Sequence, residues 1–171
     1  MTNLERCQQF WQSRRSIVLS TSNEAGVGET SVTPFIHDES GNLYIFISEL
    51  AQHTQNLLNL MANSAGKTDS ENLVVSALLV SDESETEQLF ARERLTLQLK
   101  PSEIERTSAE FAPLIKQLED EFGEVVGLLN SLPDFHLIQL KPVSGGYVIG
   151  FGKAFTFEGC PCNGLTPVTK G

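Results

Sequence analysis

A succession of short segments with strand-like composition, interrupted by two helical stretches, constrains the fold of this 171-residue chain more than any other feature. Residues 16–22, 29–38 and 42–48 are rich in β-branched and apolar residues, and the turn sequences NEAGVG and DESGN separate them. This spacing predicts three antiparallel strands with short connections. Further strands are predicted at 73–81, 92–100, 135–142, 145–151 and 153–159. Because strands and helices do not alternate regularly, a parallel sheet is excluded.

Helical periodicity marks the remaining segments. Residues 3–13 predict a short helix, and a second helix follows the third strand. Its buried side is predicted to consist of Leu57, Leu58, Leu60 and Met61. Residues 64–72 predict a polar loop. Ser102 and Glu105 match a capping box and predict a helix start, after which apolar residues follow a helical period up to Gly123, with a break near Pro113.

The strands at 73–81 and 135–142 are apolar on both faces. In a small antiparallel barrel one face fills the interior, and helices or a second subunit must cover the other. Because few helices are available, we predict a mainly β, closed antiparallel barrel that forms a homodimer through its wall. The domain is predicted to span residues 1–171, with a barrel core at 15–158 and a C-terminal tail at 159–171.

The composition limits the classes of binding partner that we expect. The chain has 22 acidic and 12 basic residues, a net charge of −10, and no basic stripe. Nucleic acids and anionic membranes are held by Lys and Arg, so neither is an expected partner. The first residues lack the apolar core of a signal peptide, and the three cysteines are expected to be reduced in a cytoplasmic protein. Cys160 and Cys162 form a C-x-C pair, whose metal or redox use is the weaker alternative.

Polar residues gather where the third strand meets the following helix. Ser48, His53, Thr54 and Asn56 lie close to the predicted helix start. The unpaired N–H groups and partial positive charge of a helix N-terminus attract phosphate or carboxylate, and these side chains would complete an anion cradle. Simple helix capping with a surface histidine is the alternative.

Two further pairs could carry chemistry. Arg92 and Arg94 lie two apart on a predicted strand and so point the same way, which suits a phosphate or carboxylate, although surface salt bridges are an equal alternative. Asp134 and His136 lie two apart at the start of another strand. Four glycines follow: Gly145, Gly146, Gly150 and Gly152. They allow turns in the backbone or the close approach of a flat group.

Taken together, the strands, the sequence ISELAQHTQNL, the sequence FARERLTL and the sequence DFHLIQLKPVSGGYVIGFGKAF resemble the haem-utilisation branch of the pyridoxamine 5′-phosphate oxidase-like split barrels. The resemblance runs from about Ser16 to Phe157. It implies a six-stranded antiparallel split barrel, dimeric, with two ligand sites at the subunit interface.

Flavin-binding relatives hold FMN in such sites, and the resemblance implies which residues would do so here. The second strand would supply Ser31, Thr33 and Pro34, the segment from Ser48 to Thr54 would bind the phosphate, and Arg94, with Arg92 nearby, would line the ring. Many flavin-binding relatives have an Arg-Lys pair in the phosphate pocket, where this chain has Gln52 and His53.

Haem-degrading relatives use a histidine near the C-terminus as the iron ligand, poised by an aspartate at the position of Asp134. No histidine follows His136 in this sequence, so either another residue such as His136 ligates iron or haem is not the native ligand. The main expectation is therefore an FMN-dependent oxidoreductase. The alternatives are a haem-binding protein, for storage or as a haem-degrading oxygenase, and a cofactor-free dimer that binds a protein or metabolite. No catalytic acid or base is assigned.

Overall fold

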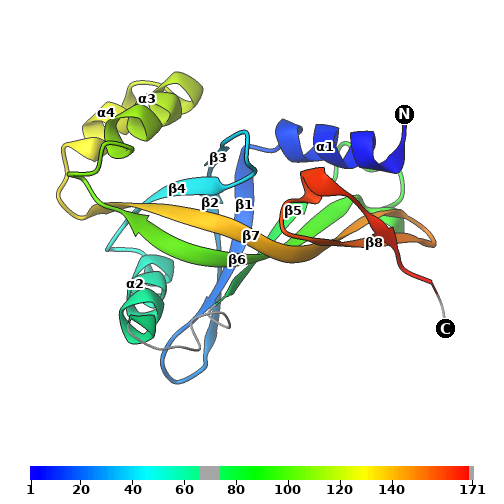
Figure 1. The fold of residues 1–171 in the computed structure, drawn as a ribbon, viewed down its shortest axis with the longest axis horizontal. Coiled ribbons are helices and arrows are strands. Elements are labelled where there is room, and N and C mark those ends of the chain that lie inside the picture. The colour runs from blue at the N-terminus through cyan, green and yellow to red at the C-terminus, as the bar shows by residue number, and fades with distance from the viewer. Residues whose placement is uncertain (66–73, 170–171) are drawn as a thin grey trace.

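The computed structural model describes residues 1–65 and 74–169 (Figure 1). Most of the loop predicted at 64–72 lies outside these residues. Within them, nine antiparallel strands form one sheet in the order β2-β1-β5-β6-β7-β4-β3, and β8 extends it from β7 to β9. The strands are β1 (Ser16–Ser22), β2 (Gly28–Pro34), β3 (Ile36–His37), β4 (Leu43–Ser48), β5 (Val75–Val80), β6 (Arg94–Ile104), β7 (Phe135–Gly150), β8 (Lys153–Glu158) and β9 (Thr166–Pro167).

The helices flank this sheet. They are α1 (Asn3–Ser13), α2 (Gln52–Ser64), α3 (Phe111–Phe122) and α4 (Val125–Asn130), with the 3₁₀ turns η2 (Leu89–Ala91) and η3 (Pro161–Asn163). Figure 1 shows α1 at one end of the molecule with both termini, and α3 and α4 at the other end. The predicted mainly β antiparallel fold with flanking helices is confirmed. No helix in the described ranges is long and apolar enough to span a membrane.

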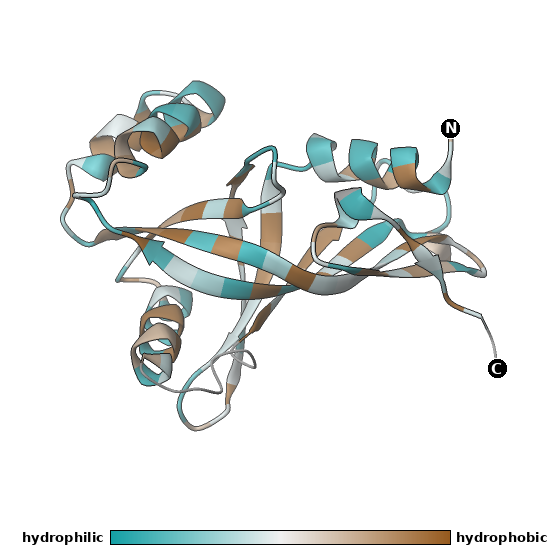
Figure 2. Cartoon of the chain, viewed as in Figure 1, coloured by the Kyte–Doolittle hydropathy of each residue, from teal (hydrophilic) through white to brown (hydrophobic). Residues whose placement is uncertain are grey.

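The sheet curls until its two ends meet. β2 and β3 lie at opposite ends of the strand order, yet Phe35 alone connects them. One residue extends the chain by only about 3.5 Å, so the two edges must be brought together. The enclosed space is filled by side chains that alternate inward along the strands, among them Leu19, Leu79, Leu97 and Tyr147, each 0% exposed. Figure 2 shows this alternation of hydrophobic and hydrophilic residues along β6 and β7.

Two apolar clusters anchor the helices. Cys7, Phe10 and Trp11 of α1 join the main core inside the curled sheet. A second cluster joins α3 and α4 to the sheet through Phe111, Ile115, Leu118 and Val126, packed against Ile36, Tyr44, Ile104 and Leu137.

Two sequence predictions about the longest strands are wrong. Ser102 does not cap a helix, because β6 continues through it to Ile104 and its hydroxyl donates to Oε1 of Gln139, at 3.3 Å. The strands predicted at 135–142 and 145–151 are one strand, β7. Pro142 is tolerated because the β6–β7 register shifts there: Leu99 pairs with Pro142 and Gln98 with Ser144, so Val143 is bulged out of the ladder.

Candidate functional site

The junction of β4 and α2 brings together two predicted constellations. The β4–β7 register pairs Ser48 with Phe135, so Asp134 lies beside Ser48. The Ser48 hydroxyl donates to Oδ2 of Asp134 at 2.7 Å, and the amide of Glu49 donates to the Asp134 carbonyl at 2.9 Å. The amide of Leu50 donates to the Ser48 hydroxyl at 3.1 Å. Ser48 and Asp134 therefore secure the turn that leads into α2.

His53 faces β2 rather than the strand junction. Its Nδ1 lies 2.8 Å from the hydroxyl of Ser31, which is also a predicted site residue. Burial lowers the pKa of His53, and the nearby Glu29 offsets this only in part. The ring is therefore neutral at pH 7 and adds no positive charge to the start of α2.

Thr54 and Asn56 point into the protein. Asn56 is 3% exposed, and its Nδ2 donates to the hydroxyl of Thr21 at 3.0 Å while its Oδ1 accepts from Nε2 of Gln52. Thr54 is 0% exposed, and its hydroxyl has no hydrogen-bond partner among the described residues. Thr33 is also buried, and its hydroxyl donates to the carbonyl of Pro34 at 3.3 Å.

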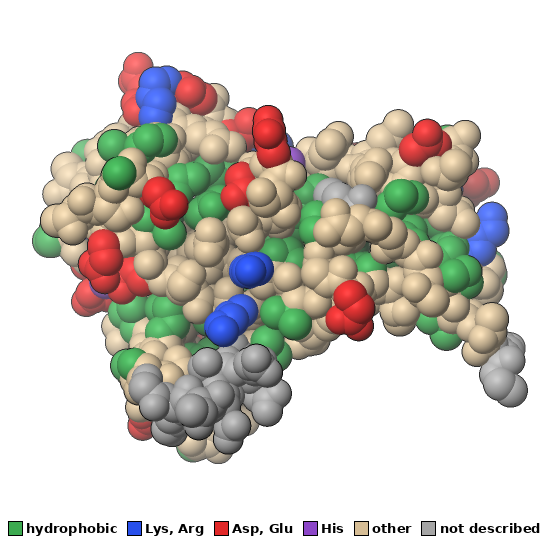
Figure 3. Space-filling model, viewed as in Figure 1, with side chains coloured by type: hydrophobic (Ala, Val, Ile, Leu, Met, Phe, Trp, Pro, Cys, Tyr) green, Lys and Arg blue, Asp and Glu red, His purple; other side chains and the backbone are tan. Residues whose placement is uncertain are grey.

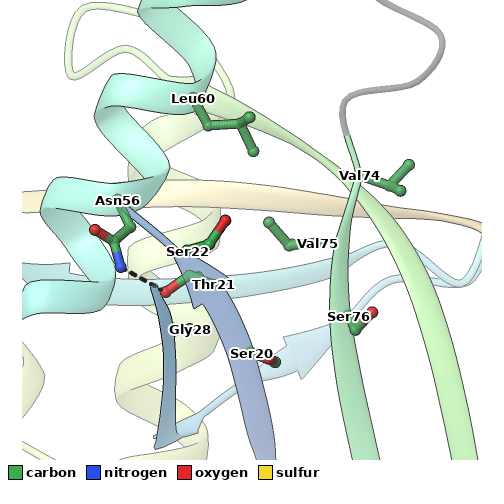
Figure 4. Close-up of a pocket in the computed structure, with 9 residues that line it drawn as sticks. All are labelled: Ser20, Thr21, Ser22, Gly28, Asn56, Leu60, Val74, Val75 and Ser76. Carbon is green, nitrogen blue, oxygen red and sulfur yellow. Dashed lines mark hydrogen bonds between the residues drawn. The ribbon is translucent and has the colours of Figure 1, made fainter. Parts of the chain in front are cut away.

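A small pocket adjoins Asn56 and has a volume of about 260 Å³. Figure 4 shows Asn56 reaching from α2 towards Thr21 on β1, with Leu60 and Val75 also in the wall. Its lining is completed by Ser20, Ser22, Gly28, Val74 and Ser76. None of these lining residues is charged, so the pocket offers hydroxyl groups but no cation to hold a phosphate.

The two predicted arginines donate hydrogen bonds to backbone carbonyls. Arg92 precedes β6 instead of lying on it, and its Nε donates to the carbonyl of Ser81 at 2.7 Å. Arg94 donates from Nη1 to the carbonyl of Arg92 at 3.0 Å. Among the described residues, no hydrogen bond or ion pair links either arginine to His53.

His136 is held between two carboxylates. Its Nδ1 lies 2.6 Å from Glu103 on β6, and its Nε2 lies 2.7 Å from Glu49 after β4. Burial is the largest single effect and lowers the pKa of His136, but the hydrogen bonds to Glu103 and Glu49 together outweigh it, and the pKa is raised. The raised pKa and the two carboxylates favour the protonated ring, which ties β7 to β6 and to the β4–α2 turn.

A larger open cleft lies between α2 and the end of β6, with a volume of about 560 Å³. We call it the α2–β6 cleft, and its lining residues are Leu58, Met61, Ala62, Ser64, Pro101, Ser102, Glu103 and Glu105. The prediction that Leu58 and Met61 are buried is only partly right, because both stay half-exposed at this cleft. The sequence prediction of the site did not include the cleft, because it joins two segments about forty residues apart.

The cysteines show no reactive arrangement in the described part of the chain. Burial, with a smaller effect of Glu93, raises the pKa of the Cys7 thiol to about 12, so it stays protonated at pH 7. Cys160 is buried as well, and the side chain of Cys162 lies outside the described part. No group of three His, Cys, Asp or Glu side chains that could hold a metal ion occurs within that part.

Comparison with known proteins gives a consistent set of relatives. No protein-family model matches the chain. It is 35% identical over 152 residues to the haem oxygenase HutZ of Vibrio cholerae, which covers 89% of this chain and 79% of that protein. The crystal structure of HutZ, described as the haem storage protein from Vibrio cholerae, has a TM-score of 0.72 and 30% identity, covering 93% of this chain and 96% of that chain. ChuZ of Campylobacter jejuni has a TM-score of 0.78 and 28% identity, and the match covers 96% of this chain but 61% of that chain.

The expected FMN-dependent oxidoreductase is wrong. Both descriptions of HutZ refer to haem. A structure assigned to the pyridoxinephosphate oxidase family, from Clostridium acetobutylicum, shares 13% identity with a TM-score of 0.59, which shows a common split-barrel fold and no more. The physical reason lies in the predicted phosphate pocket, where His53 is neutral and Arg92 and Arg94 are bonded to backbone carbonyls.

Proposed function

We propose that this chain, which belongs to the haem-utilisation branch of the pyridoxamine 5′-phosphate oxidase-like split-barrel proteins, binds haem. The observation that carries the proposal is the 35% identity to the haem oxygenase HutZ over 152 residues. The two descriptions of HutZ, as a haem oxygenase and as a haem storage protein, both require haem to be bound first.

The α2–β6 cleft fits the general shape of this ligand. Its volume of about 560 Å³ falls in the range of small-molecule pockets, roughly 300–1,000 Å³. Leu58, Met61 and Ala62 give it an apolar wall on α2, and burying a flat apolar macrocycle against such a wall is favourable. Glu103 also lines the cleft, and its carboxylate is hydrogen-bonded to His136.

The histidines bear on how iron would be held. A histidine must be neutral to donate a nitrogen lone pair to a metal. His136 is one hydrogen bond from the cleft, through Glu103, and it would have to release one carboxylate and a proton before coordinating iron. It remains the predicted ligand, with Asp134 nearby, and His53 is the second histidine to test. When bound, haem would supply redox chemistry at its iron, tuned by the axial ligand and its hydrogen bonds.

A homodimer is the second part of the proposal, and the outer face of the sheet supports it. On β1, β5, β6 and β7, Val18, Leu78, Thr96 and Gly146 are cross-strand neighbours, and Val80, Arg94 and Val148 form the next row. In a chain with 22 acidic residues, neither row contains one. A partner that buried this face would lose no carboxylate hydration. Light scattering during size-exclusion chromatography should give a dimer, and Leu78→Glu should give a monomer where Val168→Glu does not.

Haem binding is tested by adding hemin to the purified protein and recording absorbance from 300 to 700 nm, with FMN as a comparison ligand. The proposal expects a saturable Soret band with hemin. His136→Ala and His53→Ala should then separate the two histidines, because loss of the axial ligand changes the position of the band. A spectrum identical to that of free hemin at every ratio would contradict haem binding.

A further inference from the structure

We infer that the outer side of α4 is a docking surface for a basic amphipathic helix of a partner protein. Three large apolar side chains are exposed there: Val125 is 52% exposed, Leu128 66% and Leu132 40%. No other stretch of eight residues in the described chain exposes three such side chains. We call these three residues the α4 stripe. The inference does not depend on haem binding, because the stripe is no part of the α2–β6 cleft.

The stripe has the spacing of one side of a helix. Val125 and Leu128 lie three apart on α4. The turn continues past the end of α4, since the amide of Leu132 donates to the carbonyl of Leu129 at 3.0 Å. Residues three and four apart lie on one side of a helix. A different side faces the protein, because Val126 is 5% exposed and joins the cluster that holds α3 and α4 on the sheet. The stripe therefore stays free after α4 has packed.

Arg106 holds the backbone beside the stripe. Its Nη2 donates to the carbonyls of Leu132, at 2.8 Å, and Phe135, at 3.0 Å. Its Nη1 donates to the carbonyl of Asn130 at 3.0 Å. The planar guanidinium fixes several acceptors at once. A surface held in this way loses little conformational freedom when a partner binds, which favours binding.

The part of the chain that carries the stripe is acidic. Residues 105–134 contain seven acidic side chains and two basic ones. Both basic side chains have partners within this part, because Lys116 pairs with Asp120 and Arg106 donates to backbone carbonyls. Figure 3 shows acidic and hydrophobic side chains next to one another over the end of the molecule that carries α3 and α4. This end therefore attracts positive charge.

Two glutamates lie close to the stripe. Glu124 directly precedes Val125 and is exposed. A carboxylate oxygen of Glu119 lies 3.5 Å from the position that a Cβ on Gly127 would take, so this carboxylate lies against α4. Neither glutamate forms a salt bridge with a described residue. Both can therefore pair with basic side chains of a partner.

Apolar and acidic groups together select the kind of partner. Leucine-like side chains of a partner helix would be buried against the stripe, and Lys or Arg beside them would face the glutamates. A second copy of this chain would bring the same carboxylates against each other, and an anionic bilayer would bring phosphates. Both are repelled, because like charges facing each other across an interface are costly.

The test uses the full chain and a fluorescein-labelled synthetic helix with leucine on one side and lysine on the other, followed by fluorescence anisotropy. A second peptide has glutamate in place of lysine. We expect the lysine peptide to bind, added salt to weaken its binding, and the glutamate peptide not to bind. Leu128→Ser should lower the affinity about tenfold, and Glu119→Gln and Glu124→Gln about threefold each. Val168→Ser is the matched control for Val125→Ser, because Val168 is 55% exposed, and only Val125→Ser should weaken binding.

Four results would overturn the inference. They are no binding of the lysine peptide to the wild type, equal affinity for the wild type and Leu128→Ser, an equal loss for the two valine variants, and binding of the glutamate peptide as tightly as the lysine peptide. Binding of the wild type to phosphatidylcholine vesicles that Leu128→Ser abolishes would assign the stripe to a membrane instead. Glu124→Gln changes an exposed side chain outside the core, so its salt-dependent loss of affinity separates docking from an effect on folding.

Discussion

Gly145 lies where the neighbouring residues leave no room for a side chain, and Gly145→Ala tests this. A methyl group on Gly145 would lie closer than 3.0 Å to the carbonyl oxygen of Thr96 and to the ring of Phe157. The carbonyl belongs to the β6–β7 ladder and the ring is 3% exposed, so neither can move aside cheaply. Overpacking of this kind costs about 1–3 kcal/mol, and the two clashes together place the expected loss of unfolding free energy at about 3 kcal/mol. Urea denaturation measures it.

The adjacent glycine provides the control. A methyl group on Gly146 would lie 3.5 Å from the carbonyl oxygen of Phe155, which is ordinary contact. Because alanine restricts the unfolded chain more than glycine, Gly146→Ala should change the unfolding free energy by less than about 1 kcal/mol and in the stabilising direction. Equal losses for the two variants would refute the reasoning, because of these two glycines only Gly145 has its Cβ position occupied by other atoms of the protein.

Two further substitutions test individual side chains. His136→Gln should lower the unfolding free energy by about 1–2 kcal/mol at pH 6, a value reduced for the partial exposure of the two carboxylates. Because the folded-state pKa of His136 is raised, this stabilisation is complete below pH about 6.5 and declines as the pH rises through the folded pKa, so the variant should differ less from wild type at pH 9. A difference that grew towards pH 9 would contradict the ion pairs. Thr54→Val should raise the unfolding free energy by about 1 kcal/mol, since it removes a buried hydroxyl without a partner among the described residues. Thermal unfolding of the two proteins measures the difference, and a less stable variant would contradict this prediction.

Local patterns were sufficient to predict much of the fold. The helix at 3–13 and the first strand at 16–22 match α1 and β1, and the antiparallel arrangement follows from the short turns. The errors lie where pairing overrides local preference. Ser102 and Glu105 have the spacing of a capping box, but β7 offers β6 a partner as far as Leu137, and the strand continues.

The site was less predictable, because its character depends on partners that lie far away in the sequence. Ser48 and His53 have the residue types of an anion cradle. In the structure, however, Ser48 donates a hydrogen bond to Asp134, and His53 is neutral beside Ser31. The flat group expected near the glycines is a side chain of the protein itself, the Phe157 ring against Gly145.

The position of iron in crystals grown with hemin, located by anomalous scattering, tests the central claim most directly. We predict one iron per chain at the α2–β6 cleft, beside Leu58 and Met61. Iron located instead beside Ser31 and His53, or no ordered iron in crystals that contain hemin, would contradict it.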